Sequence, residues 1–369
     1  MIANLMALSV RARWTVLALF LVIAGLGVWQ LSKLPIDAVP DITNNQVQIN
    51  TIDPRLSPVE IEKLVTYPVE ISLAGIPGLE TTRSISRNGF SQVSAIFTDD
   101  TDLYFARQQV GERLRQAMEN LPDGVQPQIA PVTTGLGENV MYTVGYANPE
   151  GKGAKKVAGQ PGWQPDGSYL TPEGERLTDP IAKAGYLRTV QDWIISPQLK
   201  SVGGVAGVDS IGGFAKTFVV EPHPTKLASY GISYSELGQA LENANLAVGA
   251  NYFNKGGEAY LVRVDSRVRT VDEIRNAVAA TRGGTPITIG QIADVRVGGD
   301  LRTGAGSMNG QEAVIGTVLM LIGQNSRVVA EEASTKLDQV AKTLPPGIEV
   351  KVVLNRAKLV SATVATVQR

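Results

Sequence analysis

The sequence predicts an α+β fold: an apolar helix near the N-terminus, then two units of the order βαββαβ, the second interrupted by a smaller α+β module. The helix is predicted by an uncharged apolar run at residues 14–31. The two units are predicted by turn residues that recur later in the chain at almost the same spacing. The module is predicted by one interval between those turns, which is 106 residues in the second copy (204 to 310) and 11 in the first (78 to 89). With 369 residues the chain is long enough for more than one hydrophobic core.

The apolar run, WTVLALFLVIAGLGVWQL, covers 18 residues, and a membrane-spanning helix needs roughly 20. Arg11 and Arg13 precede it, which by the positive-inside rule places the N-terminus in the cytoplasm. A cleaved signal peptide is the alternative, but the run is long for one and no small-x-small cleavage motif follows it. We therefore expect residues 1–34 to form a cytoplasmic N-terminus and a first transmembrane helix, with most of the remaining chain in the periplasm.

The first βαββαβ unit is predicted at residues 35–130. Its first helix opens with Ser57-Pro58-Val59-Glu60, a capping box with proline at the first helical position. Pro68 is expected to kink this helix, because proline removes a backbone donor. Two strands then meet at Asn88-Gly89, which favours a tight hairpin turn, and a second amphipathic helix ends before Gly124. This order of elements is the ferredoxin-like one.

The same turn residues return in the second half of the chain. Asn309-Gly310 precedes an apolar strand as Asn88-Gly89 does, and Gly347 follows a helix as Gly124 does. The interval between the two glycines is 35 residues in the first copy (89 to 124) and 37 in the second (310 to 347). Such even spacing predicts two copies of one unit. Chance agreement among common Gly/Pro turns is the alternative.

We assign residues 131–215 and 295–355 to the second unit, and residues 216–294 to the module inserted in it. The module carries two capping boxes of its own, which begin at Ser233 and Thr270. A further insertion at residues 148–183 is rich in Gly, Pro and Lys and has little apolar content, which predicts an exposed hairpin or loop. Residues 356–369 are predicted to begin a helix that leads to a second membrane span.

The composition excludes several classes of function. The near-balance of 34 basic and 35 acidic residues gives no electrostatic signature of nucleic-acid binding. Cysteine is absent and histidine occurs once, which excludes thiolate and multi-histidine metal sites. A nucleophile paired with a histidine base is excluded in practice, because His223 lies between two prolines. Without a Walker A motif, ATP hydrolysis is not expected. We therefore expect no enzyme, no catalytic residue and no cofactor.

These features together resemble the first periplasmic half of exporters of the resistance–nodulation–division (RND) family. The local sequence is similar to the heavy-metal branch, and within it to the cobalt–zinc–cadmium exporters, over four segments: Leu34–Asp41 (LPIDAVPD), Thr66–Glu70 (TYPVE), Gln191–Trp193 (QDW) and Leu354–Arg356 (LNR). The resemblance covers the chain except residues 148–183. It implies that 35–130 is the first porter subdomain, 131–215 with 295–355 the second, and 216–294 a docking subdomain.

The resemblance also implies a function. The chain would be the N-terminal part of a proton-driven antiporter that expels zinc, cobalt or cadmium, with the ion as substrate rather than as cofactor. Such an exporter is a homotrimer in the bacterial inner membrane, and it works with a periplasmic membrane-fusion adaptor and an outer-membrane channel. Its proton-carrying carboxylates belong to a later transmembrane helix. No proton relay is therefore expected in these residues, and they are not expected to transport by themselves.

Glu138 and Asp192 are the candidate contacts for the transported ion. Divalent zinc, cobalt and cadmium accept carboxylate ligands, and divalent-metal members of the family resemble this chain at both positions, where the acids line the porter cleft. Glu138 lies where the chain crosses from the first unit to the second, and Asp192 lies off the apolar stripe of a helix at 187–200. The structural alternatives stay open: Glu138 can cap a turn, and Asp192 can be solvated or pair with Arg188. Met141 is expected to fill the core and His223 to lie in a surface turn.

Two rival functions are open at this point. A multidrug RND exporter has the same architecture with an aromatic-lined pocket, but only 6% of the residues are aromatic, which favours metal. A single-span periplasmic adaptor, from another class, needs long helical hairpins with heptads, and the sequence has none.

Overall fold

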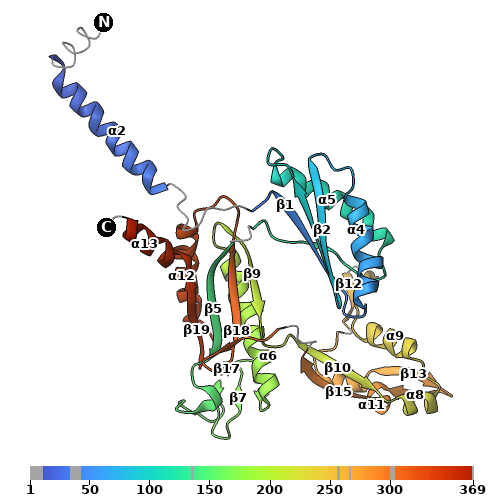
Figure 1. Cartoon of the computed structure of the whole chain (residues 1–369). Helices are drawn as coiled ribbons and strands as arrows, with labels where there is room; N and C mark the ends of the chain where they lie inside the picture. Colours follow the sequence, from blue (N-terminus) through green and yellow to red (C-terminus); the bar gives the residue numbers. More distant parts are fainter. Residues whose placement is uncertain are drawn as a thin grey trace.

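The computed structural model of the chain describes residues 11–33, 43–133, 137–255, 258–265, 267–299 and 304–367. The predicted cytoplasmic N-terminus before residue 11 and the LPIDAVPD motif lie outside the described residues. In Figure 1 one long helix stands apart from a body that contains two four-stranded sheets and a smaller mixed module.

The helix that stands apart is α2 (Arg13–Lys33), at the position predicted for the membrane span. Its large apolar side chains face outward, with Trp14 73% and Phe20 71% exposed. Within the described parts of the chain, no helix combines the length and the hydropathy that a bilayer crossing requires. The structure thus shows a helix here and does not confirm a span; the uncharged run of 18 residues is slightly shorter than the roughly 20 that a span needs.

The first sheet is antiparallel, with the strand order β2-β3-β1-β4. Its strands are β1 (Gln46–Ile52), β2 (Leu79–Arg87), β3 (Phe90–Phe97) and β4 (Gln128–Ile129), and its helical segments are α3 (Pro58–Ile61), η1 (Glu62–Thr66), α4 (Tyr67–Leu73), α5 (Leu103–Ala117) and η2 (Met118–Asn120). Both hydrogen bonds of the Ser57–Glu60 capping box form, and Asp102 caps α5. Apolar side chains of β1 and β3 pack against α4 and α5 to form the core of this unit.

The second sheet has the order β19-β5-β18-β9. Its strands are β5 (Glu138–Tyr146), β9 (Val205–Ile211), β18 (Val314–Met320) and β19 (Ile348–Asn355), and its helical segments are α6 (Pro180–Val190), η4 (Gln191–Ile195), α7 (Ser196–Lys200) and α12 (Ser326–Ala341). A short hairpin of β16 (Ser307–Met308) and β17 (Gln311–Glu312) precedes β18, and α13 (Arg356–Val367) follows β19. When the four strands of each unit are numbered in chain order, both sheets have the same spatial order, 4-1-3-2.

The turn residues that suggested a repeat have matching backbone conformations. Each pair of glycines has nearly the same positive φ, a region that favours glycine: Gly78 (+79°) and Gly204 (+81°), Gly89 (+69°) and Gly310 (+74°), Gly124 (+85°) and Gly347 (+83°). The chain therefore reverses direction in the same way at three equivalent places in the two units.

The segment between β9 and β18 contains a module with its own core. Its elements are β10 (Lys216–Pro222), α8 (Pro224–Tyr230), α9 (Tyr234–Ala244), β11 (Ala247–Lys255), β12 (Glu258–Asp265), α10 (Val271–Asn276), β13 (Val278–Arg282), β14 (Thr285–Thr288), α11 (Ile289–Ile292) and β15 (Ala293–Gly299). Strands β10 and β15 pair along their full length, so the chain enters and leaves the module side by side (Figure 1).

The insertion at 148–183 differs from its prediction in one respect, its buried aromatic residues. It contains the turn η3 (Pro149–Gly151) and a three-stranded sheet of β6 (Gly162–Trp163), β7 (Tyr169–Leu170) and β8 (Arg176–Leu177). Trp163 and Tyr169 are 3% and 0% exposed, and their rings pack on each other and on Tyr146 of β5. The predicted hairpin is therefore present and most of its residues are exposed, but a few aromatic residues anchor this otherwise polar segment in the core of the second unit, which was not predicted.

Candidate functional site

The helix that carries Asp192 contains a π turn. Asp179 caps its N-terminus by accepting hydrogen bonds from the amides of Ile181 and Ala182. Near its other end, Pro197 has no amide to donate, and the preceding Ser196 amide bonds to the carbonyl of Gln191, five residues earlier. The first unit repeats this arrangement before Pro68, where Tyr67 bonds to Glu62. The kink expected at Pro68 is thus a π turn, a feature that is frequent at functional sites.

Asp192 lies in this π turn with both carboxylate oxygens hydrogen-bonded. The Arg188 Nε donates to one oxygen at 2.6 Å, and the Ser210 hydroxyl on β9 donates to the other at 2.8 Å. The side chains of Arg188 and Asp192 are 26% and 35% exposed. The alternative in which Asp192 pairs with Arg188 is therefore confirmed, and the carboxylate is held in place while part of it still meets solvent.

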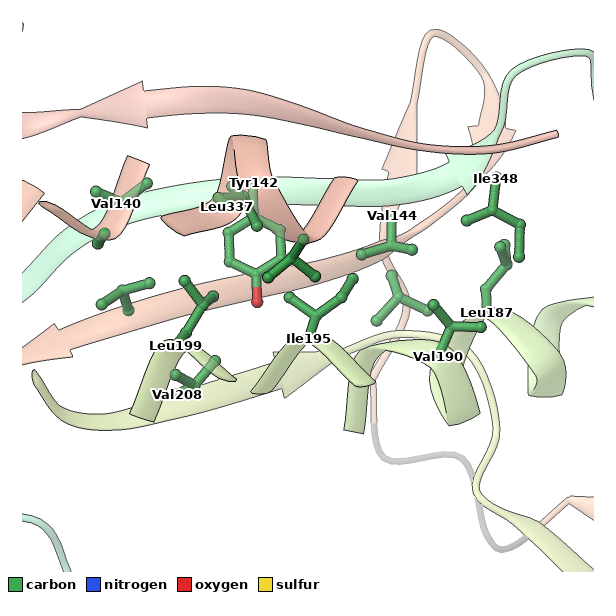
Figure 2. Packing of buried hydrophobic residues seen from close by; sticks show 14 of the residues in the cluster. Val140, Tyr142, Val144, Leu187, Val190, Ile195, Leu199, Val208, Leu337 and Ile348 are labelled. Atoms are coloured by element: carbon green, nitrogen blue, oxygen red, sulfur yellow. The ribbon is translucent and has the colours of Figure 1, made fainter. Parts of the chain in front are cut away.

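A chain of hydrogen bonds connects Asp192 to the core. The buried Tyr142 hydroxyl donates to Gln191 Oε1 at 3.0 Å, and Gln191 Nε2 donates to the Ser210 hydroxyl at 3.2 Å. Figure 2 shows Tyr142 pointing its hydroxyl away from β5, between Ile195 and Leu199. Burial raises the pKa of Tyr142 well above its ordinary value, so the hydroxyl stays a donor. The Ser210 hydroxyl is thereby oriented toward Asp192.

A surface groove lies beside Asp192. Its lining comes from the π-turn helix and from the start of the inserted module: Arg188, Thr189, Asp192, Trp193, Ala215, Lys216, Thr217 and Phe218. Trp193 is 79% exposed and Phe218 is 40% exposed. The groove therefore combines one partly open carboxylate with two basic side chains, Arg188 and Lys216, and with the apolar surfaces of Trp193 and Phe218.

Glu138 is exposed at the start of β5, opposite Leu319 of β18. Among the described residues its side chain caps no turn, which was the structural alternative, and it lies four residues along the strand from Tyr142, a separation of about 13 Å. The structure thus does not bring Glu138 and Asp192 into one contact cluster. Among the described residues, no group of three or more His, Asp or Glu side chains could hold a metal ion. Each acid alone would supply a single ligand.

Asn139 was not anticipated from the sequence. Val140 pairs with Val318 and Glu138 pairs with Leu319, so Asn139 is the additional residue of a β-bulge. It is 1% exposed, and neither polar atom of its amide has a hydrogen-bond partner within the described residues. Bulges are common beside functional sites, and this one lies directly next to Glu138. No local pattern in the sequence marks it.

The two other potential ligands lie apart from the groove. Met141 is half-buried on β5. His223 begins α8 in the inserted module, and its Nε2 lies 3.1 Å from Asp294. His223 is therefore half-buried and joins β10 to α8, instead of lying in the predicted surface turn.

The architecture and the local sequence agree with one family of known proteins. The sequence profile of the AcrB/AcrD/AcrF family matches residues 5–369. The chain belongs to this family, whose members are RND exporters. The alternative of a periplasmic adaptor is thereby excluded, and the members of the family are transporters rather than enzymes.

Several RND proteins are similar to the whole chain. It is 59% identical to the nickel-cobalt-cadmium resistance protein NccA of Alcaligenes xylosoxydans xylosoxydans and 57% identical to the nickel and cobalt resistance protein CnrA of Cupriavidus metallidurans, in each case over 100% of this chain and 34% of the relative. The cobalt-zinc-cadmium resistance protein CzcA of Cupriavidus metallidurans is 45% identical over 100% of this chain and 32% of that protein. The chain spans about a third of the length of these relatives.

A solved structure agrees with the sequence comparison. The crystal structure of a heavy metal efflux pump superposes with a TM-score of 0.80 at 28% identity, over 99% of this chain and 33% of the pump. This RND chain therefore has the mixed α/β architecture of part of such a pump.

Proposed function

We propose that the chain is part of an RND exporter that expels divalent heavy-metal cations from the cell, driven by proton antiport. The main support for this proposal is the 59% identity, over all 369 residues, to a nickel-cobalt-cadmium resistance protein. Cobalt is named in that relative, in CnrA and in the CzcA of Cupriavidus metallidurans, so we infer cobalt as a substrate, with zinc, cadmium and nickel as further candidates.

The proposed subdomains follow the observed sheets. The sheet of β1–β4 would be the first porter subdomain, the sheet of β5, β9, β18 and β19 the second, and the module between β10 and β15 the docking subdomain. The identical strand order of the two sheets supports this division. The exposed apolar side chains of α2 support a place in the membrane part of the full-length inner-membrane pump. A homotrimer with a periplasmic adaptor and an outer-membrane channel is proposed from the family.

Glu138 and Asp192 are proposed as contacts of the moving ion. Their carboxylate oxygens suit cobalt, zinc and cadmium, whereas copper(I) and silver(I) prefer thiolate and thioether ligands. A single carboxylate is a weak site, because zinc prefers four ligands, so we infer that other parts of the pump supply the remaining ligands. Weak contact suits a transported ion, which must also leave.

The proposal is tested by the metal tolerance of cells that carry the full-length pump, either wild type or with Glu138→Ala or Asp192→Ala. We expect wild type to raise tolerance to cobalt, zinc or cadmium and both variants to lower it. Asp166→Ala is a matched control for Asp192, because Asp166 also pairs with an arginine (Arg176, 2.7 Å) and accepts from a serine hydroxyl (Ser168, 2.6 Å).

The outcomes separate the claims. Unchanged tolerance in both variants removes the two contacts and leaves metal export standing. A wild-type pump that protects against dyes and antibiotics but not against metals would establish the multidrug alternative instead.

A further inference from the structure

We propose that Arg188 sets the affinity of Asp192 for a divalent cation, because its guanidinium competes with the cation for the same carboxylate. This inference rests on the proposed function, in which Asp192 contacts the transported ion. The new element is Arg188, a basic residue that regulates how tightly Asp192 binds the ion.

Arg188 occupies the position on Asp192 that a cation would take. Its Nε lies 2.6 Å from Oδ2, in an ion pair across one helical turn. A divalent cation on the same oxygen would lie within a few ångströms of the guanidinium, and like charges at that separation repel. Binding of the cation therefore requires the guanidinium to move away from Asp192.

The second partner of Asp192 is held by the buried core of the unit. The Ser210 hydroxyl donates to Oδ1 and is itself held by the buried Gln191, which Tyr142 orients in turn. This chain keeps the carboxylate in one orientation when Arg188 leaves. The carboxylate has two oxygens and several acceptor positions, so Ser210 and a cation can bind it together.

Arg188 also donates a hydrogen bond to a second acceptor, which it can retain when it leaves Asp192. Its Nη1 donates to the carbonyl of Gly212 at 3.1 Å. The stem is packed closely at this turn, since a side-chain carbon on Gly213 would come within 2.9 Å of the Arg188 Cβ. In the proposed exchange the guanidinium turns away from Asp192, keeps the Gly212 bond and meets solvent in the groove with its remaining donors, because the Arg188 side chain is 26% exposed and lines that groove. Exchange between Arg188 and a cation leaves no charged group buried and unpaired.

The test is a calorimetric titration of Co²⁺ into the full-length pump in detergent. We expect Arg188→Met to bind Co²⁺ about fivefold more tightly than wild type, which is the factor that a partly exposed ion pair contributes at most. Arg275→Met is a matched control, because Arg275 also joins an acid on its own helix (Asp272, 3.0 Å) to a backbone carbonyl (Val295, 2.8 Å). Its affinity for Co²⁺ should stay within twofold of wild type.

A double variant separates competition from a general structural effect. If Arg188 acts through the Asp192 carboxylate, Arg188→Met has no effect on Co²⁺ affinity once Asp192→Asn is present. Arg188→Lys keeps the charge but not the Nε donor, and we expect it to tighten binding by less than Arg188→Met. It also serves as the test if Arg188→Met does not fold.

The results distinguish the ion contact of Asp192 from the competition by Arg188. Arg188 variants that bind Co²⁺ as wild type does, while Asp192→Asn binds more weakly, overturn the competition and leave the ion contact intact. Asp192→Asn that binds like wild type removes Asp192 from the proposed ion path, and the role of Arg188 with it. Equal tightening by Arg188→Met with and without the Asp192 carboxylate would also contradict competition.

Discussion

The two βαββαβ units share one topology but differ in the side chains that fill the space between sheet and helices. The first unit has two side chains of moderate size at a place where the second has one large ring and a glycine. In the first unit Val47 of β1 faces Ala95 of β3, and at the equivalent place in the second unit Tyr142 of β5 faces Gly316 of β18. A Cβ on Gly316 would lie 2.2 Å from the Tyr142 ring. The glycine therefore makes room for a ring that the first unit has no space to hold.

The different side-chain volumes decide how far hydrogen-bonded polar groups extend from the core of each unit toward its surface. In the first unit the Thr66 hydroxyl, at the end of the π turn, meets the hydroxyls of Ser86 and Ser91 at 2.8 and 2.7 Å, and this cluster contains no charged group. In the second unit Tyr142 begins a hydrogen-bonded chain that ends at the Asp192 carboxylate beside the groove. The two units therefore share their topology, whereas the charged site depends on the larger side chain of Tyr142 and on the missing side chain of Gly316.

The largest effect is expected for Gly316→Ala, because the new methyl group overlaps the Tyr142 ring. We expect the free energy of unfolding to fall by about 3 kcal/mol, measured by urea denaturation. Gly145→Ala is the control in the neighbouring strand, since a Cβ there meets no atom within 4 Å. Equal effects of the two substitutions would contradict the proposed fit of glycine and ring.

An intermediate effect is expected for Tyr142→Phe. The substitution keeps the ring but leaves the buried Gln191 Oε1 without its donor, which should lower the free energy of unfolding by about 2 kcal/mol. The measurement is again urea denaturation, with the 41% exposed Tyr230→Phe as control. If both substitutions are neutral, the chain of hydrogen bonds does not stabilise the second unit.

The smallest effect is expected for the dependence of stability on pH. Here it is the first unit that holds the charged group. In the first unit the buried Asp53 accepts hydrogen bonds from Arg55 Nε and Nη2, both at 2.8 Å, and the Arg55 side chain holds the pKa of Asp53 below its usual value. At the equivalent position the second unit has a neutral amide, Asn148.

Because the folded pKa of Asp53 is lowered, its contribution to stability is complete above the unfolded value of about 3.9 and is lost as the pH falls through the folded value. We therefore expect Asp53→Asn to reduce the loss of stability between pH 6 and pH 3. The check is the free energy of unfolding in urea at several pH values. Identical pH profiles for wild type and variant would rule out this contribution.

The sequence predicted those features that depend on neighbouring residues. The positive φ of Gly89 and Gly310 was expected from the Asn-Gly turns, because only the local backbone decides it. The pair of Arg188 and Asp192 was an open alternative for the same reason, since residues four apart on a helix are neighbours.

The features that were missed join distant segments. Low apolar content suggested an exposed insertion, yet Trp163 and Tyr169 fit into a gap against Tyr146 that only the folded unit creates. The β-bulge at Asn139 likewise depends on the register between β5 and β18, and no pattern within β5 reveals it. Two isolated aromatic residues in a polar segment were the one signal that pointed to the buried part of the insertion.

The order of the elements, the places where the chain turns and the charge types available for a site could be derived from the residues alone, because backbone preferences and side-chain chemistry belong to single residues and their neighbours. That Ser210 joins Arg188 on the carboxylate of Asp192, and that Glu138 lies apart from them, became visible in the folded chain alone. Such meetings depend on strand register and on the volumes of side chains from separate strands and helices, which are fixed only when the sheet packs against its helices.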